Sequence, residues 1–98
     1  MGAPGSGAAS AQRSVTIVNQ KGLHARAAAK FVRLAQSFDG TLKVTAKGQT
    51  VSGHSLMGLM LLAAGPGTRL EITAEGEDAP RAVAALVKLV EDGFDEGS

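Results

Sequence analysis

A histidine, a glycine and an arginine lie within five residues of one another in the stretch GLHAR, and the chain that follows is rich in alanine. His24 stands two residues after Gly22 and two residues before Arg26. Imidazole is a nucleophile near neutral pH and can form a covalent intermediate. A guanidinium presents several N–H donors in a geometry that suits phosphate oxygens. These residue types therefore allow one particular chemistry, the transient attachment of a phosphoryl group to His24.

The predicted element that follows His24 would strengthen this chemistry. Apolar residues recur with helical spacing from Ala25 to about Gln36, so His24 falls at the start of a helix. The first N–H groups of a helix lack intrahelical acceptors, and together with the helix dipole they favour an anion. Gly22 allows the preceding loop to approach closely or to adopt a positive φ. A simpler interpretation, in which His24 is a surface residue tolerated at a helix start, stays open at this point.

A second candidate site is Ser55, which precedes the apolar run LMGLMLLAA. Its position predicts an N-cap, so its hydroxyl has a structural role whatever else it does. A serine at this position can also accept a phosphate, which would place about two negative charges beside an apolar surface. One face of a short helix cannot bury every large side chain of the run, so we expect part of it to form an exposed docking patch. The large side chains in question are Leu56, Met57, Leu59, Met60, Leu61 and Leu62.

Seven elements are predicted to position these residues. Strands are typical of alternating or β-branched stretches, and helices of apolar residues at i, i+3, i+4 and i+7. The first helix has such a stripe at Ala28, Phe31, Val32 and Ala35, beside a basic stripe at Arg26, Lys30 and Arg33, and the last has one at Val83, Leu86, Val87 and Val90. The expected strands are 14–18, 41–45, 49–51 and 69–73, and the expected helices are 25–36, a short one within 56–64, and one that Asp78 caps and Gly93 closes.

The order β-α-β-β-α-β-α predicts an α+β fold. Four strands can form an antiparallel sheet with the three helices on one face, which is the simplest way to bury every helix. The length of 98 residues suits one domain. Residues 1–12, rich in Gly, Ala, Ser and Pro, are expected to be a flexible tail outside the fold.

Composition and charge exclude several classes of function. The chain has no cysteine, which excludes disulfides, thiolate metal sites and cysteine nucleophiles. No apolar run approaches a membrane span, and no secretory signal is expected. Residues 1–60 carry seven basic residues and one acidic residue, whereas residues 61–98 carry three and eight. This asymmetry would steer an acidic partner or an anion toward one side of the molecule, although it could also reflect two solvated faces.

Metal and nucleic-acid binding are poorly supported. His24 and His54 are thirty residues apart and have no cysteine or neighbouring acidic residue to complete a ligand set. The three aromatic residues are all Phe, which gives no stacking platform for single-stranded nucleic acid. A basic nucleic-acid-binding module stays an alternative with a distinct expectation, strongly salt-dependent binding. The basic stripe is better explained as a complement to an acidic protein partner.

Two motifs resemble one known family. The stretch GLHARAAAKFV resembles the active-site segment of HPr, the histidine-containing phosphocarrier proteins of the bacterial phosphoenolpyruvate-dependent phosphotransferase system, and HSLMGLMLLAA resembles the regulatory-serine segment of that family. Both occur in the expected order, and the resemblance covers residues 13–93, leaving 94–98 as a short C-terminal tail. It implies an open-faced β-sandwich, in agreement with the element order above. Ala27 stands where many members have proline, and His54 where a lysine or arginine often precedes the serine.

The resemblance also implies roles for individual residues. His24 matches the histidine that enzyme I phosphorylates on Nδ1, and Arg26 matches the arginine that stabilises the phosphohistidine. Ser55 matches the serine that a regulatory kinase, HPr kinase/phosphorylase, modifies in many members. Leu56, Met57, Leu59 and Met60 match the docking surface for enzyme I and for the IIA acceptor.

We therefore predict that the protein is a cytoplasmic, monomeric phosphocarrier and not an enzyme. We expect it to need no cofactor, hold no metal, bind no nucleic acid and not insert into membranes. The alternative is a regulatory, nitrogen-type module of the same family that is not coupled to sugar transport.

Overall fold

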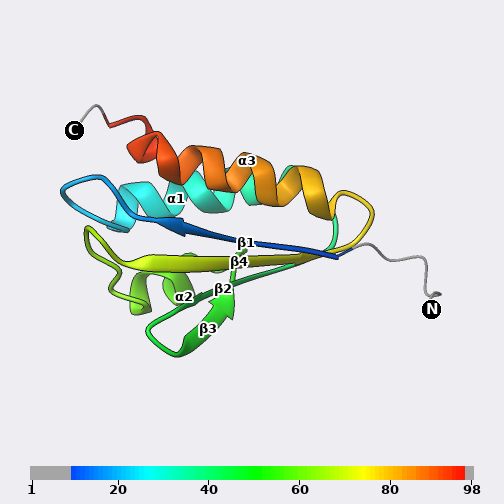
Figure 1. The fold of residues 1–98 in the computed structure, drawn as a ribbon, viewed down its shortest axis with the longest axis horizontal. Helices are drawn as coiled ribbons and strands as arrows, with labels where there is room; N and C mark the ends of the chain where they lie inside the picture. The colour runs from blue at the N-terminus through cyan, green and yellow to red at the C-terminus, as the bar shows by residue number, and fades with distance from the viewer. Residues whose placement is uncertain (1–9, 97–98) are drawn as a thin grey trace.

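The structure is a computed structural model that describes residues 10–96. Its strands are β1 (Ser10–Thr16), β2 (Thr41–Ala46), β3 (Gln49–Ser52) and β4 (Arg69–Glu75). Its helices are α1 (Ala25–Ala35), α2 (Leu56–Leu61) and α3 (Ala79–Glu91), followed by a short 3-10 turn, η1 (Gly93–Asp95). The predicted order of strands and helices is confirmed, and the fold is an open-faced β-sandwich of the α+β class (Figure 1).

The sheet has the strand order β1-β4-β2-β3, and every neighbouring pair is antiparallel. Residues alternate along its central strands, so that Val44 and its partner Ile72 face the helices and are fully buried. Lys47 and Gly48, both with positive φ, form the tight turn between β2 and β3 that the sequence predicts.

The helices cover one face of the sheet. Helix α3 packs across β1 and β4, α2 lies beside β3, and α1 contacts both of the other helices. The predicted stripe of α3 is entirely buried, and in α1 the stripe is buried except at Val32, which is partly exposed. Within residues 10–96, no helix combines the length and the apolar character that a membrane crossing needs.

The first strand begins earlier than its sequence pattern predicts. β1 starts at Ser10, where it pairs with Glu75, and ends at Thr16 instead of Val18. The stretch from Ser10 to Ser14 is polar except for Ala11, but pairing with β4 supplies hydrogen-bonding partners for its backbone. The predicted tail over residues 1–12 therefore overlaps β1 at residues 10–12, and its first nine residues lie outside the described residues.

The chain end also differs from the expected short tail over residues 94–98. Phe94 is fully buried in the core, and Gly93, Phe94 and Asp95 all have positive φ. Three consecutive left-handed residues reverse the chain direction after α3, so that Glu96 points back toward the start of α1. This reversal places a carboxylate at the site described below. Residues 97–98 of this tail lie outside the described residues.

Candidate functional site

His24 is the N-cap residue of α1. Its backbone is extended, with φ −76° and ψ 179°, and its carbonyl accepts the first helical hydrogen bond from the Ala28 N–H at 2.8 Å. The loop before it is fixed at Gly22, whose φ is +65° and where a Cβ atom would lie 2.4 Å from the Ala64 carbonyl oxygen. The next N–H, that of Leu23, donates to the same Ala64 oxygen at 2.8 Å. The segment between Ala64 and Gly22 thereby sets the approach of the chain to the helix.

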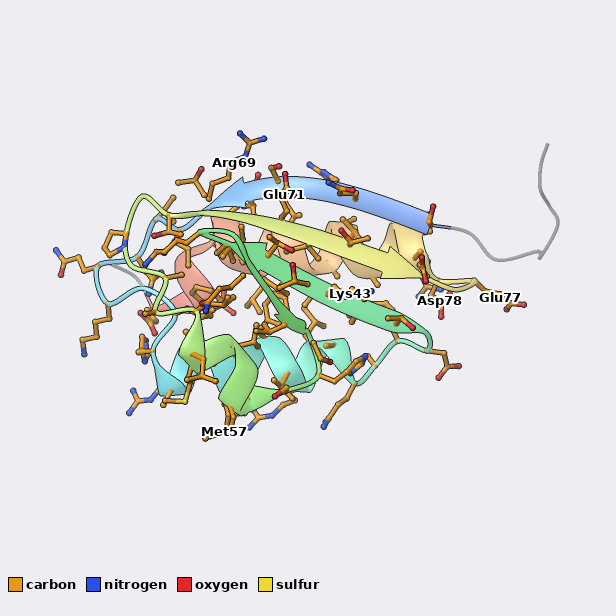
Figure 2. The ribbon with its side chains drawn as sticks, turned by 90° about the horizontal axis from the view of Figure 1, so that it is seen from below. Lys43, Met57, Arg69, Glu71, Glu77 and Asp78 are labelled. Atoms are coloured by element: carbon orange, nitrogen blue, oxygen red, sulfur yellow. The ribbon has the colours of Figure 1, made fainter. Side chains whose placement is uncertain are left out.

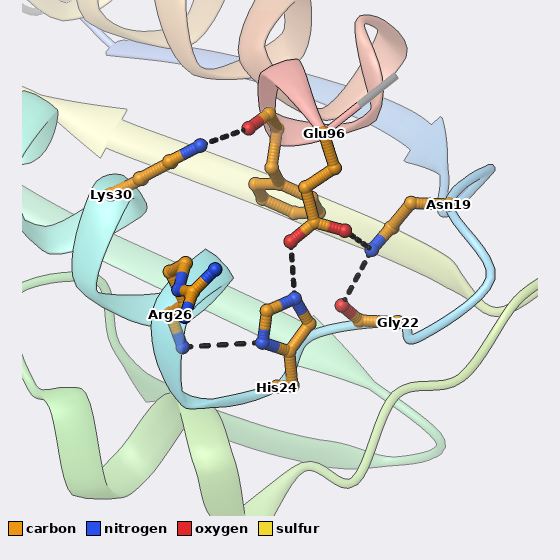
Figure 3. A network of polar contacts seen from close by, with 7 residues as sticks. Asn19, Gly22, His24, Arg26, Lys30 and Glu96 are labelled. Atoms are coloured by element: carbon orange, nitrogen blue, oxygen red, sulfur yellow. Dashed lines mark hydrogen bonds and ion pairs between the residues drawn. The ribbon is translucent and has the colours of Figure 1, made fainter. Parts of the chain in front are cut away.

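Both nitrogens of the His24 ring have polar partners (Figure 3). Nδ1 accepts a hydrogen bond from the Arg26 backbone N–H at 3.2 Å, and Nε2 contacts Oε2 of Glu96. An ionised carboxylate can only accept, so the proton of the neutral ring lies on Nε2 and the lone pair on Nδ1. These two contacts hold the ring in place, and because the side chain of His24 is 26% exposed, solvent can still reach it.

Glu96 is held by two donors. Its Oε2 accepts from His24, and its Oε1 accepts from the side-chain nitrogen of Asn19 at 3.0 Å. Desolvation raises the pKa of the Glu96 carboxyl, but hydrogen bonds from His24 and Asn19 and the charges of His24 and Lys30 outweigh it and hold that pKa below its ordinary value. The carboxylate is therefore ionised at neutral pH.

The surroundings of the ring favour an anion. A surface hollow of about 660 Å³ opens beside His24, and its charged lining consists of three basic residues, Lys21, Arg26 and Lys30, and two acidic ones, Asp95 and Glu96. The first turn of α1 contains no acidic residue. The side chain of Lys30 donates to the Phe94 carbonyl at 2.6 Å, whereas the exposed Arg26 guanidinium makes no hydrogen bond or ion pair within residues 10–96. The Arg26 guanidinium is thus available to a phosphoryl group.

Ser55 is the N-cap residue of α2, as the sequence predicts. Its Oγ accepts a hydrogen bond from the Gly58 N–H at 2.9 Å, and its side chain is partly buried. The residue does not line the hollow at His24. The structure therefore places the two predicted sites at the starts of two different helices.

Four apolar side chains of α2 are exposed, and we call Leu56, Met57, Met60 and Leu61 the α2 patch. Met57 is 71% exposed and lies at the outer edge of the molecule in Figure 2. The inclusion of Leu59 in a docking surface is wrong, because Leu59 is fully buried beside Leu62 in the core. Leu59 is the buried residue of α2, and Leu62 is its C-cap residue. Leu61, which lies outside the predicted docking set, is exposed.

Sequence reasoning missed Glu96 and Asn19. Glu96 fell in an expected tail, and Asn19 was part of an expected loop. The one available signal was Phe94, a large apolar residue within the polar C-terminal stretch, which indicates a segment that folds back onto the core. Within residues 10–96, no group of three or more acidic or histidine side chains is arranged to hold a metal ion.

Comparison with known proteins adds the decisive observation. Residues 11–92 match the family model described as "PTS HPr component phosphorylation site". The chain belongs to the HPr family. It is 48% identical over 84 residues to the phosphocarrier protein HPr of Pseudomonas aeruginosa, a match covering 85% of this chain and 93% of the relative. It is also 40% identical over 87 residues to the phosphocarrier protein NPr of Shewanella violacea, covering 89% of this chain and 96% of the relative.

A solved HPr structure supports the same assignment. The crystal structure of HPr-C-His from Thermoanaerobacter tengcongensis has a TM-score of 0.84 and 38% sequence identity, and the match covers 88% of this chain and 97% of that one. Membership of the family means that the chain is a phosphocarrier component of the phosphotransferase system rather than a catalytic enzyme.

Proposed function

We propose that this protein accepts a phosphoryl group from enzyme I on Nδ1 of His24 and passes it to a IIA acceptor. The observation that carries the proposal is that the two nitrogens of the His24 ring have different partners. Nε2 is occupied by Glu96, while Nδ1 accepts from the Arg26 N–H at the start of α1, and His24 and Arg26 line the same hollow. This arrangement leaves Nδ1 as the nucleophile.

The phosphoryl transfer from enzyme I to His24 needs no reagent other than the two proteins. The Nδ1 lone pair forms a bond to phosphorus as the bond between phosphorus and the donor atom of enzyme I breaks, and that electron pair stays with the donor. The Arg26 N–H, which donates to Nδ1 in the unphosphorylated protein, becomes free to donate to a phosphoryl oxygen. In the second transfer the electron pair returns to Nδ1, and the acceptor forms the new bond to phosphorus.

Glu96 would stabilise the charge that develops during the reaction. When Nδ1 bonds to phosphorus and Nε2 keeps its proton, the ring gains positive charge, which the adjacent carboxylate offsets. The Arg26 guanidinium and the helix start offset the negative charge of the phosphoryl group. Both partial charges of the intermediate therefore have a fixed complement.

Partner docking and regulation form the second part of the proposal. The α2 patch is exposed, and Arg26 and Arg33 lie exposed on the neighbouring α1, which suits a partner surface that is apolar at its centre and acidic at its rim. A phosphate on Ser55 would add about two negative charges at the edge of this patch, which would weaken binding of such a partner. HPr kinase/phosphorylase is the proposed source of that phosphate.

A regulatory, nitrogen-type role is the second candidate, and the relative named NPr favours it. Both roles use the same histidine chemistry and differ in the enzyme I and the acceptor with which the protein exchanges phosphate. Phosphorylation by purified sugar-type and nitrogen-type enzyme I, compared at equal concentration, distinguishes them.

The central test is incubation with phosphoenolpyruvate and enzyme I, followed by intact mass measurement at neutral and at acidic pH. We expect an acid-labile phosphoryl adduct that is absent from His24→Ala and forms more slowly in Arg26→Ala. An adduct that persists in His24→Ala would show that another residue carries the group.

A further inference from the structure

The chain segment after α3 folds back behind His24 and is attached at three points. The Phe94 ring is buried in the core, the Phe94 carbonyl accepts from the side chain of Lys30 at 2.6 Å, and Glu96 bonds to His24 and Asn19. The first two attachments fix the backbone of the turn. They leave the side chain of Glu96 free to rotate, so the position of its carboxylate depends on the third.

Asn19 supplies that third attachment. It lies in the loop between β1 and α1 and is only 1% exposed. Its side-chain nitrogen donates to the Gly22 carbonyl at 2.9 Å and to Oε1 of Glu96 at 3.0 Å (Figure 3). One carboxamide thus connects the loop in front of His24 with the carboxylate behind it.

The orientation of this carboxamide is imposed by its partners. Its oxygen, Oδ1, is buried and has no hydrogen-bond partner within residues 10–96. Rotating the amide by half a turn would place that oxygen against the Gly22 carbonyl and the Glu96 carboxylate, which are both acceptors. Burying the Oδ1 atom without a hydrogen-bond partner costs free energy. The two hydrogen bonds that the side-chain N–H groups donate offset this cost and keep the amide in this orientation.

We propose that Asn19 is a positioning residue for phosphoryl transfer, because it holds the Glu96 carboxylate where it binds the Nε2–H of His24 and leaves the Nδ1 lone pair facing the helix start. The inference rests on the proposed function of His24 and adds a residue that does not touch the phosphoryl group. Without the Asn19 donors the Glu96 side chain samples other rotamers, the ring loses its partner on Nε2, and Nδ1 is less often aligned for attack.

The first test uses the unphosphorylated protein, so it does not depend on the proposed function. Imidazole ¹H–¹⁵N NMR spectra report which ring nitrogen carries the proton and how fast that proton exchanges with water. We expect a slowly exchanging Nε2–H signal in the wild-type protein and in Glu91→Gln, a matched control that removes an exposed carboxylate of α3. The signal is lost in Asn19→Leu, which keeps the size of the side chain without its donors, and in Glu96→Ala.

A reciprocal exchange tests the specific hydrogen bond. In the double variant Asn19→Asp with Glu96→Gln, the glutamine amide can donate to the aspartate while its oxygen accepts from His24 Nε2–H. We expect Asn19→Asp alone to lose the Nε2–H signal, because two carboxylates then face each other. The double variant should regain part of the signal, since the new carboxylate still faces the Gly22 carbonyl. A double variant no better than Asn19→Asp alone would overturn the role given to the Asn19–Glu96 bond.

The second readout is the rate of phosphorylation by enzyme I. We expect Asn19→Leu to lower kcat about ten-fold with KM unchanged, because Asn19 is buried and outside the partner surface; ten-fold corresponds to ~1.4 kcal/mol, the order of one hydrogen bond to a charged group. An unchanged Nε2–H signal and rate in a folded Asn19→Leu protein would overturn the proposal. If that variant does not fold, Asn19→Ala, which removes the same donors without filling the buried site, decides by the same two measurements. Failure of the wild-type protein to be phosphorylated on His24 would instead refute the proposed function and leave the NMR result standing.

Discussion

The N-termini of α1 and α2 have the same local capping hydrogen bond but differ in the tertiary contacts of the capping side chain. In each, the side chain of the N-cap residue accepts a backbone N–H, from Arg26 to His24 and from Gly58 to Ser55. The His24 ring has a further partner, the side chain of Glu96, 72 residues away in the sequence, whereas within residues 10–96 the Ser55 side chain bonds only to the Gly58 N–H. A local cap is sufficient to begin a helix, but a ring that must present one chosen nitrogen needs a tertiary partner for the other.

This difference predicts that a mutation in the turn after α3 changes the structure around the start of α1 but not around the start of α2. Replacing Phe94 by Ala removes a fully buried ring and should lower the free energy of unfolding by about 3–5 kcal/mol. In the folded fraction, amide chemical shifts should change around His24 and remain unchanged around Ser55. Denaturant titration and ¹H–¹⁵N spectra measure the two effects, and equal shifts at both helix starts would contradict the comparison.

The loop before His24 should be the next most sensitive position. Gly22→Ala forces a Cβ atom into a backbone with φ +65° and within 2.4 Å of the Ala64 carbonyl oxygen. We expect a loss of more than about 1 kcal/mol in the free energy of unfolding. Gly48→Ala is the matched control, because its φ is +80° but nothing lies within 4 Å of the added Cβ. Equal losses in both variants would mean that strain in φ, and not the contact with Ala64, sets the cost.

Ser55 should respond as a cap alone in the unmodified protein. Ser55→Ala leaves the Gly58 N–H without its acceptor and should cost about 1 kcal/mol of unfolding free energy. Ser55→Asp should be close to wild type in stability, because aspartate is an equally good N-cap. Thermal unfolding of the three proteins measures this order. A clear loss in Ser55→Asp would show that Oγ does more than accept the Gly58 N–H.

The smallest expected effect is a pH dependence of stability that arises from Glu96, beside the start of α1. Since the pKa of Glu96 is held below its ordinary value in the folded protein, its contribution to stability is present above about pH 4.5 and is lost as pH falls through the lowered pKa. The difference in Tm between the wild-type protein and Glu96→Gln should therefore shrink on acidification, whereas the difference for Glu91→Gln should not follow this course. A difference that grows in acid would reverse the sign assigned to this carboxylate.

Residue patterns predicted the helices well because each buries a stripe that repeats at helical spacing. The stripe of α3 is buried as expected, and Ser55 caps α2 as expected. They predicted β1 poorly, because Ser10 to Ser14 form a strand only through pairing with β4. They also misassigned Leu59, since which leucines of a short apolar helix face inward depends on where that helix lies against β3 and α1.

The sequence alone determined the order of elements, the position of His24 at a helix start and the family to which the motifs belong. These features depend on neighbouring residues, and local spacing is sufficient to specify them. Only the tertiary structure decided that Glu96 and Asn19 stand behind His24 and that the Nδ1 lone pair faces the helix start. The physical reason is that a carboxylate 72 residues away reaches the ring only after Phe94 is buried and the chain reverses at three left-handed residues.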